Sequence, residues 1–385
     1  MDHGSPPSWV GAGRPPFPDV RQIAVLRGSG LGDLVQALPA VEALAATYPG
    51  AELTLLGTPA HVALLRDRPS PVHHLEVLPI RPGVRDGGTE DRAATADFLG
   101  RMRGRAFDLA VQLHGGGRNS NPFLLELGAR HTVGSRTEDA VALERSLPYA
   151  YYQHEVVRAL EVVGLAGAVP LGLEPRLRLT PDERRRRELR RPDRPTVVLH
   201  PGATDPRRRW PAAQFAAVAS GLVADGVRVV VIGDADDRPA AAEILRRVDD
   251  PDGSVTARAG EQTLPELVQL LLDSDLVLAN DSGPRHVAAA LGLRTVGIYW
   301  VGNAVNASPL GRGRHRVQIA FTPTCPVCGV DITQVGWTAE RCAHDDSIVA
   351  DVPPARVLAD VRALLADARA EQETGREGGR DGQTA

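Results

Sequence analysis

The sequence predicts an α/β protein built from two doubly wound, Rossmann-like domains. Short β-branched or leucine-rich runs alternate with stretches of helical periodicity along most of the chain. This alternation is typical of parallel sheets covered by helices. The length of 385 residues is too great for one ordinary core and fits two domains.

The ends and the middle of the chain set the domain boundaries. Residues 1–20 carry five prolines and are predicted to be a disordered leader. The charged run Asp182–Glu188 is interpreted as a solvated helix in a linker, because its acids balance its arginines. We therefore expect an N-terminal domain at 21–175, a linker at 176–195, a C-terminal domain at 196–352, a helix at 353–369 and a disordered tail at 370–385.

Eight strands are predicted, four in each domain. The first domain has Gln22–Arg27, Glu52–Leu56, His74–Pro79 and Asp108–Leu113. The second has Thr196–His200, Val227–Gly233, Asp275–Ala279 and Thr295–Tyr299. Ligands of open α/β sheets bind beyond the carboxyl ends of the strands, so we expect the two domains to face a shared central cleft.

Composition excludes several classes of protein. The net charge of -4 is close to neutral for this length, which argues against a nucleic-acid partner. All 44 basic residues are arginine. No apolar run has membrane-spanning length and the first residues form no signal-peptide core, so we expect a cytoplasmic protein with at most peripheral membrane association.

The segment Asn280–Gly292 predicts a phosphate site. It follows the apolar run Leu276–Ala279 and opens a helix with Pro284 in the first turn. The unpaired N–H groups of such a helix start attract phosphate, although an ordinary capped helix without a ligand has the same pattern.

A second turn of this kind follows the strand Thr196–His200. There Pro201–Pro211 contains three consecutive arginines before Trp210 and an amphipathic helical run. One hydroxylated turn and one basic turn can converge on a single diphosphate.

The loop after the first strand has the glycine spacing G-x-G-x-G at Gly28–Gly32. It lacks the full dinucleotide fingerprint. An NAD-dependent oxidoreductase is therefore only an alternative, and this loop is the single feature that supports it. Asp33 places a carboxylate in the first turn of the following helix, where it could simply complement the helix dipole.

Together, Arg27–Ala40, His200–Pro211 and Asn280–Gly292 resemble the glycosyltransferase family that includes the ADP-heptose:lipopolysaccharide heptosyltransferases. The resemblance extends from about Arg21 to about Leu365. It implies the GT-B architecture, with an N-terminal acceptor domain and a C-terminal nucleotide-sugar domain. The implied reaction is transfer of a heptose, with inversion, from ADP-heptose to a hydroxyl of a glycan or small molecule.

The resemblance also implies site residues. Asp33 would be the general base, and Arg208 or Arg209 would replace the family's lysine before the Trp-Pro pair. Asp234 or Asp236 would contact the ribose. Their D-x-D spacing also matches a metal motif of another glycosyltransferase architecture. GT-B enzymes seldom need a divalent ion, however, so we expect that no cofactor is required. The donor residues are expected to be Thr204, Arg208, Arg209, Asp234, Asp236, Asp281, Ser282 and Gly283.

The acceptor is expected in the first domain. Gly30 and, after the fourth strand, His114, Arg118 and Asn119 are the candidate contacts. A flexible glycine turn with solvated side chains is the alternative explanation of the second group.

The cysteines late in the chain form the pattern C-x₂-C-x₁₃-C-x-H at Cys325, Cys328, Cys342 and His344. Four such ligands suit a structural zinc ion, although C-x-H is a tight spacing and reduced, buried thiols are the alternative. Besides the glycosyltransferase and the oxidoreductase, a non-catalytic sugar-nucleotide-binding protein of the same fold remains open.

Overall fold

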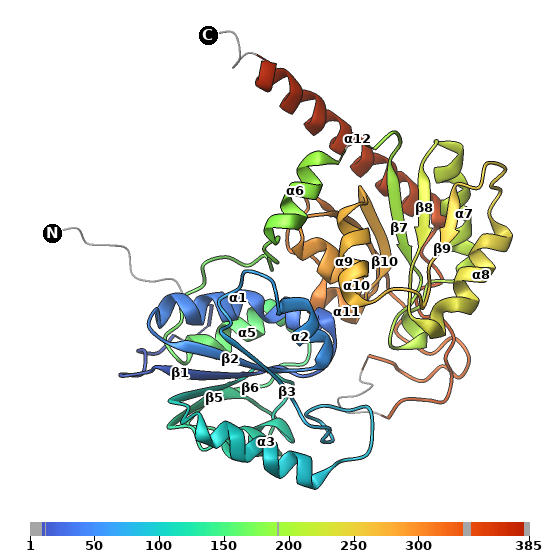
Figure 1. Cartoon of the computed structure of the whole chain (residues 1–385). Helices are drawn as coiled ribbons and strands as arrows, with labels where there is room; N and C mark the ends of the chain where they lie inside the picture. The colour runs from blue at the N-terminus through green and yellow to red at the C-terminus, as the bar shows by residue number, and fades with distance from the viewer. Residues whose placement is uncertain (1–9, 12, 191, 334–339, 381–385) are drawn as a thin grey trace. The chain divides into compact units, whose positions relative to one another are not determined.

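The computed structural model describes residues 10–11, 13–190, 192–333 and 340–380 of the chain (Figure 1). The chain divides into two compact units, Met1–Thr180 and Pro181–Ala385. The division falls within the stretch that the sequence marks as a linker, and its charged run forms the solvated helix α6 (Pro181–Leu189).

The first unit is a parallel sheet covered by helices. Its six described strands have the order β3-β2-β1-β4-β5-β6. The strands are β1 (Gln22–Leu26), β2 (Glu52–Gly57), β3 (His74–Val77), β4 (Leu109–Gln112), β5 (His131–Arg136) and β6 (Arg145–Pro148). The helices are α1 (Leu31–Thr47), α2 (Pro59–Leu65), α3 (Arg92–Gly104), α4 (Ser120–Leu125) and α5 (Glu155–Gly164).

The second unit repeats this plan with the order β9-β8-β7-β10-β11-β12 among its described strands. The strands are β7 (Thr196–His200), β8 (Arg228–Val231), β9 (Val255–Ala257), β10 (Leu276–Asn280), β11 (Arg294–Trp300) and β12 (His315–Ala320). The helices are α6 (Pro181–Leu189), α7 (Ala212–Ala224), α8 (Arg238–Arg247), α9 (Leu264–Leu272), α10 (Gly283–Ala290), α11 (Val301–Ala307) and α12 (Pro354–Arg380), with 3₁₀ turns η1 (Pro206–Arg208) and η2 (Ala235–Asp237).

Each sheet reverses its strand order at one point. In the first unit β1 pairs with both β2 and β4, and in the second β7 pairs with both β8 and β10. At such a switch point the loops after the two central strands lead to opposite faces of the sheet and leave a crevice. The candidate site residues after β1, β4, β7 and β10 all lie at these two points.

All eight predicted strands are confirmed, and the structure adds β5, β6, β9 and β12. Three of these additions are edge strands: β6 ends in a proline, β9 has three residues, and β12 mixes charged and apolar positions. Edge strands are less buried and so have weaker hydrophobic patterns. In β5, polar residues and Gly134 interrupt the apolar run.

The described part of the predicted leader is packed rather than disordered. The Phe17 side chain is only 5% exposed, its backbone N–H donates to the Tyr48 hydroxyl at 3.1 Å, and its ring stacks on His131 with centroids 4.1 Å apart. Burial of this one aromatic residue outweighs the proline-rich composition around it, so the prediction is wrong for residues 13–20. Residues 1–9 and 12 lie outside the described residues.

The C-terminal helix is longer than predicted. Helix α12 continues through Arg380, so residues 370–380 of the predicted tail are helical. An ion pair of 2.6 Å between Glu371 and the buried Arg294 attaches this extension to the start of β11. Residues 381–385 lie outside the described residues.

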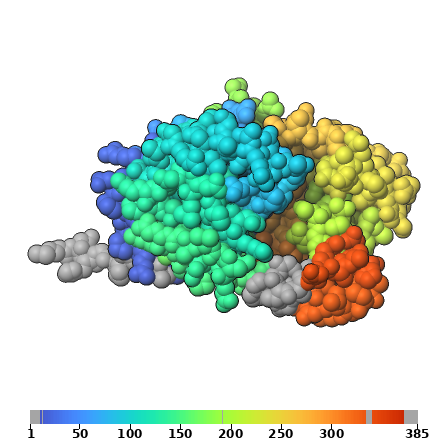
Figure 2. Space-filling view, turned by 90° about the horizontal axis from the view of Figure 1, so that it is seen from below, coloured from blue at the N-terminus to red at the C-terminus, as the bar shows by residue number. Residues whose placement is uncertain are grey.

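The segment between β12 and α12 packs back onto the same unit. Ile348 donates its N–H to the Arg207 carbonyl at 2.8 Å, and the Trp210 indole donates to the Val352 carbonyl at 3.0 Å. In Figure 2 this orange-red segment lies directly against the yellow-green surface of its unit. Among the described helices, none has the length and apolar character needed to cross a bilayer.

Candidate functional site

Two turns at the carboxyl ends of β7 and β10 form the candidate donor site. The strands pair so that Ala279 lies opposite His200, which brings the turns together. The buried Asn280 joins them: its side-chain amide donates to the Pro201 carbonyl at 2.7 Å, and its oxygen accepts the Trp210 N–H at 3.1 Å. The convergence predicted from the sequence is thus present in the backbone.

A cavity of about 690 Å³ opens at this edge of the second sheet. Both turns line it, together with the η2 turn after β8 and the start of α9. Its volume falls in the range of pockets that bind small molecules and cofactors. Of the predicted donor residues, Thr204, Arg209, Asp234, Asp236, Ser282 and Gly283 line the cavity.

The three consecutive arginines have different partners. Arg207 pairs with Asp205 at 2.6 Å, and Arg208 pairs with Asp281 at 3.1 Å beside the cavity. Arg209 donates to the Ala203 carbonyl at 3.0 Å and forms no ion pair with any described residue. Arg209 is therefore the arginine whose charge is available to an anion in the cavity.

Asp281 lies behind the turn after β10 rather than in the cavity. It is buried and accepts hydrogen bonds from Arg208 and from His286, whose Nε2 is 3.0 Å away. Burial alone would raise the pKa of Asp281, but the His286 hydrogen bond and the neighbouring arginine charges hold it below its usual range. This network fixes the backbone from which Ser282 projects.

The sequence did not single out His200 or Asp237, and both line the cavity. His200 Nδ1 lies 3.0 Å from the Ser282 hydroxyl, and its Nε2 lies 3.7 Å from Asp237. Burial lowers the pKa of His200 to about 4 and raises that of Asp237, so the imidazole is neutral near pH 7. His200 is the last residue of β7 and Asp237 follows β8 in the η2 turn, so their place near the carboxyl ends of strands was the available signal.

The turn after β7 requires a glycine. A Cβ on Gly202 would lie 2.2 Å from Asp237 Oδ2, far inside van der Waals contact. The close approach of this backbone to Asp237 explains why the turn begins with Pro201-Gly202.

In the first unit, Asp33 lies in the first turn of α1. Its Oδ2 accepts the Gly30 N–H at 3.0 Å, and its Oδ1 accepts Arg27 Nη2 at 2.8 Å. The Asp33 side chain remains 40% exposed. Two hydrogen bonds orient the carboxylate while it stays accessible to a substrate hydroxyl.

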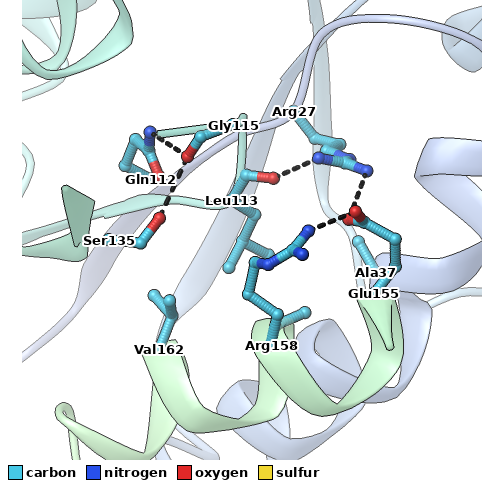
Figure 3. A pocket seen from close by; sticks show the side chains of 10 residues that line it. Arg27, Ala37, Gln112, Leu113, Gly115, Ser135, Glu155, Arg158 and Val162 are labelled. Atoms are coloured by element: carbon cyan, nitrogen blue, oxygen red, sulfur yellow. Dashed lines mark hydrogen bonds and ion pairs between the residues drawn. The ribbon is translucent and has the colours of Figure 1, made fainter. Parts of the chain in front are cut away.

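A buried charge network holds Arg27 (Figure 3). Arg27 also donates to the Leu113 carbonyl and to Glu155 at 3.3 Å, and Glu155 accepts Arg158 in turn. Arg158 is buried and donates to three backbone carbonyls of residues 150–153. These residues orient Arg27, and through it Asp33.

The expected acceptor residues do not form one group. The Gly30 carbonyl accepts the buried His61, and His114 packs against the same loop, 3.0 Å from where a Gly28 Cβ would lie. Burial and then the charge of Arg27 lower the pKa of His114 to about 4. In contrast, the Arg118 side chain is 77% exposed and lies 3.4 Å from Asp139, and Asn119 is also exposed.

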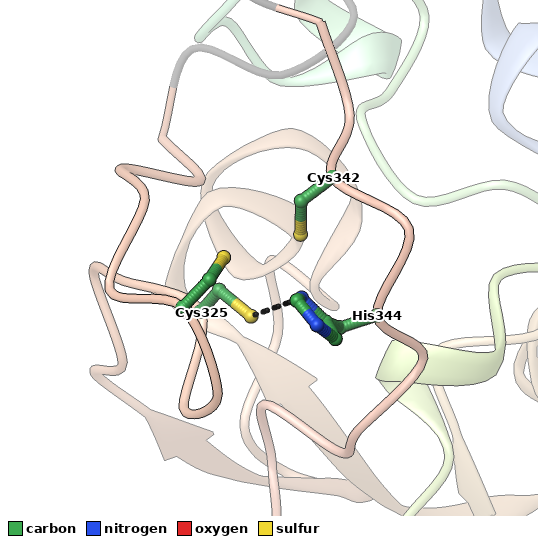
Figure 4. Close-up of side chains that lie close together, drawn as sticks. Cys325, Cys342 and His344 are labelled. Atoms are coloured by element: carbon green, nitrogen blue, oxygen red, sulfur yellow. Dashed lines mark hydrogen bonds between the residues drawn. The ribbon is translucent and has the colours of Figure 1, made fainter.

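Cys325, Cys328, Cys342 and His344 lie together in the second unit (Figure 4). Their ligand atoms are all within 4.8 Å of one another, and Cys325 Sγ lies 3.7 Å from His344 Nδ1. Neighbouring ligand atoms of a tetrahedral zinc site are about 3.8 Å apart. The residues therefore fit a metal ion after small side-chain movements.

Known proteins resemble the chain in sequence and in fold. Residues 96–324 match the family model described as glycosyltransferase family 9 (heptosyltransferase). The chain is 26% identical over 365 residues to lipopolysaccharide heptosyltransferase 2 of Salmonella typhimurium, covering 90% of this chain and 99% of that protein.

Solved structures share the fold. The Escherichia coli ADP-heptose LPS heptosyltransferase II superposes with a TM-score of 0.68 at 23% identity, covering 91% of this chain and 99% of that one. The iron-containing dodecameric glycosyltransferase TibC of enterotoxigenic E. coli superposes with a TM-score of 0.53 at 14% identity, covering 92% and 78%. The predicted GT-B fold is confirmed.

Proposed function

The chain belongs to glycosyltransferase family 9, and from this premise we propose that it transfers a heptose from ADP-heptose to a hydroxyl group of a glycan or small molecule. The observation that carries the proposal is the cavity at the switch point of the second sheet, lined by a basic and a hydroxylated turn. The structurally similar E. coli protein is named an ADP-heptose LPS heptosyltransferase, and we propose the same donor for this chain.

The second unit would bind the donor. Arg209 would pair with the diphosphate, and the Ser282 hydroxyl with the N–H groups at the start of α10 would receive the charge that develops on the leaving group. Asp234 and Asp236, which also line the cavity, would accept hydrogen bonds from the ribose hydroxyls. Arg208 and Asp281 would support the turn from behind.

The first unit would bind the acceptor. Asp33 would take the proton of the attacking hydroxyl, which typically accelerates such a step by about 10²–10⁴-fold. A single in-line displacement would then invert the anomeric carbon without a covalent intermediate. His114, beside the same loop, would border the acceptor, whereas Arg118 and Asn119 would contact only an extended acceptor.

Calorimetric titration with ADP, UDP, GDP and NADH tests the donor assignment. We expect selective binding of ADP, which Ser282→Ala and Arg209→Ala should weaken. UDP or GDP selectivity would keep the enzyme class and reject ADP-heptose as donor. Binding of NADH alone would contradict the proposal.

We also propose that Cys325, Cys328, Cys342 and His344 hold a structural metal ion. Three thiols and an imidazole suit Zn²⁺, and elemental analysis of the purified chain identifies the ion. If the analysis finds iron, the metal that TibC contains, the identity of the ion would change and the four proposed ligands would stay the same.

We also propose a cytoplasmic location, checked by fractionation of producing cells.

A further inference from the structure

The cysteine cluster is connected to the donor site through one short stretch of chain. Residues 340–352, here called the cluster arm, carry two of the four ligands, Cys342 and His344. The segment from Asp205 to Trp210, here called the arginine turn, carries Arg209 of the donor cavity. Both lie in the second unit.

Four contacts join the arm to the arginine turn and the helix after it. Ile348 N–H donates to the Arg207 carbonyl at 2.8 Å, and Arg341 lies 3.7 Å from Asp205. The indole of Trp210 and the amide of Gln214 donate to carbonyls of the arm at 3.0 and 2.7 Å. The arm therefore supports the outer side of the turn whose inner side lines the cavity.

The arm has no regular secondary structure, and only its last residues, Ile348, Val349 and Val352, are buried apolar side chains. Its residues form no helix or strand, so neither a helical ladder nor a sheet fixes its backbone. After residue 352 the chain continues into α12, which anchors one end. The two ligands Cys342 and His344 lie at the other end, a few residues before Ile348.

The other two ligands are on a preformed turn. Cys325 donates its N–H to the Val330 carbonyl at 2.8 Å, and Gly329 donates to the Cys325 carbonyl at 2.9 Å. Gly329 has φ +72°, a conformation that glycine adopts without strain. A metal ion would therefore attach the irregular arm to a rigid turn.

We propose that the metal ion held by Cys325, Cys328, Cys342 and His344 fixes the cluster arm and thereby positions the arginine turn for the donor diphosphate. This inference rests on the proposed function. Arg209 depends on the geometry of the turn because its own N–H donates to the Pro206 carbonyl at 3.0 Å. Loss of the metal would loosen the Arg207 carbonyl contact and displace the Arg209 side chain.

The test compares Cys342→Ser with Val327→Ser in the full chain. Val327 lies between the ligands Cys325 and Cys328, is 55% exposed, and its side chain is not a ligand. We expect Cys342→Ser to lose most of its metal and to bind ADP at least about tenfold more weakly, which corresponds to about 1.4 kcal/mol. Val327→Ser should retain both metal and ADP affinity.

A second pair of variants tests the route of the coupling. Ile348→Pro removes the N–H that reaches Arg207, whereas Ile348→Ala keeps it and shortens the side chain. Ile348→Pro should retain metal and lose ADP affinity relative to Ile348→Ala. In hydrogen exchange, the amides of Arg208, Arg209 and Trp210 should become less protected in Cys342→Ser, and Zn²⁺ added to metal-free wild type should restore their protection.

The outcomes separate the two proposals. A metal-loaded wild-type chain that does not bind ADP would reject the donor assignment. A Cys342→Ser chain that loses metal but binds ADP like wild type would overturn the coupling and leave the donor assignment intact. Full ADP affinity in wild type purified without metal would overturn it as well.

Discussion

At the scale of single residues, the arginine turn shows how identical side chains acquire different roles. Arg207 and Arg208 each face an acid, Asp205 and Asp281, so their charges are neutralised locally. Arg209 faces a backbone carbonyl and the cavity. Its charge is the one that a diphosphate would pair with, because pairing it requires no existing ion pair to break.

Arg209→Ala should therefore affect mainly ADP affinity, whereas Arg208→Ala should affect mainly stability. Arg209→Ala removes a charge-assisted contact, so ADP affinity should fall by roughly 10- to 100-fold with little change in the urea midpoint. Arg208→Ala leaves the buried Asp281 with one fewer partner, so it should lower the urea midpoint. Equal losses of ADP affinity without any change in stability would contradict this division of roles.

Asp33→Asn should remove the proposed base and leave the donor cavity unchanged. We expect transfer from ADP-heptose to fall by about 10²–10⁴-fold while ADP affinity, measured by calorimetry, stays at the wild-type value. Asp97→Asn on α3 is the matched control, because its side chain is 71% exposed and pairs only with Arg101 among the described residues. Loss of ADP affinity in Asp33→Asn would contradict the assigned role.

At the scale of elements, the central strands and the turns after them could be predicted from the sequence, because hydrophobic patterning determines where they lie. The central strands β1, β4, β7 and β10 are apolar runs, and the turns after them contain most of the predicted donor and acceptor residues. Side-chain geometry was not predictable, since the contact of His200 with Ser282 joins residues 82 positions apart. The choice among three arginines also depends on partners that only the folded chain brings close.

The packed N-terminal segment allows an element-scale prediction. Phe17→Ala removes a buried ring that stacks on His131 and lies under Arg145, whose guanidinium is 3.7 Å from the ring centroid. Large-to-small changes at such sites cost about 3–5 kcal/mol, so urea unfolding should show a clear loss of stability. Phe321→Ala, at a 69% exposed ring, should be nearly neutral; similar midpoints for both variants would mean that the leader is not packed.

At the scale of the whole molecule, both units withdraw histidines from water: His200 is buried, and His114 and His315 are half-buried. Burial lowers the pKa of His114, His200 and His315 to about 4, whereas the unfolded chain would titrate them near 6.5. The unfolded state therefore binds more protons between these values, so stability is full above pH 6.5 and falls as the pH drops toward 4.

Urea unfolding at about pH 7.5 and about pH 5 checks this expectation. The midpoint should be lower at the acidic pH, and His315→Gln should reduce the difference, because it removes one of the histidines whose pKa the fold lowers. A midpoint that is independent of pH across this range would contradict the burial of neutral histidines in the folded chain.

The continuity of the donor cavity along the chain has a further consequence. Every residue that lines it falls between His200 and Pro284, in a unit that the chain begins at Pro181, whereas Asp33 and His114 lie before that junction. Under the proposed function, donor preference would thus be encoded in one contiguous block of sequence. Recombination between family members at the Thr180–Pro181 junction would exchange the nucleotide-sugar and keep the acceptor, a modular route by which new glycans can arise.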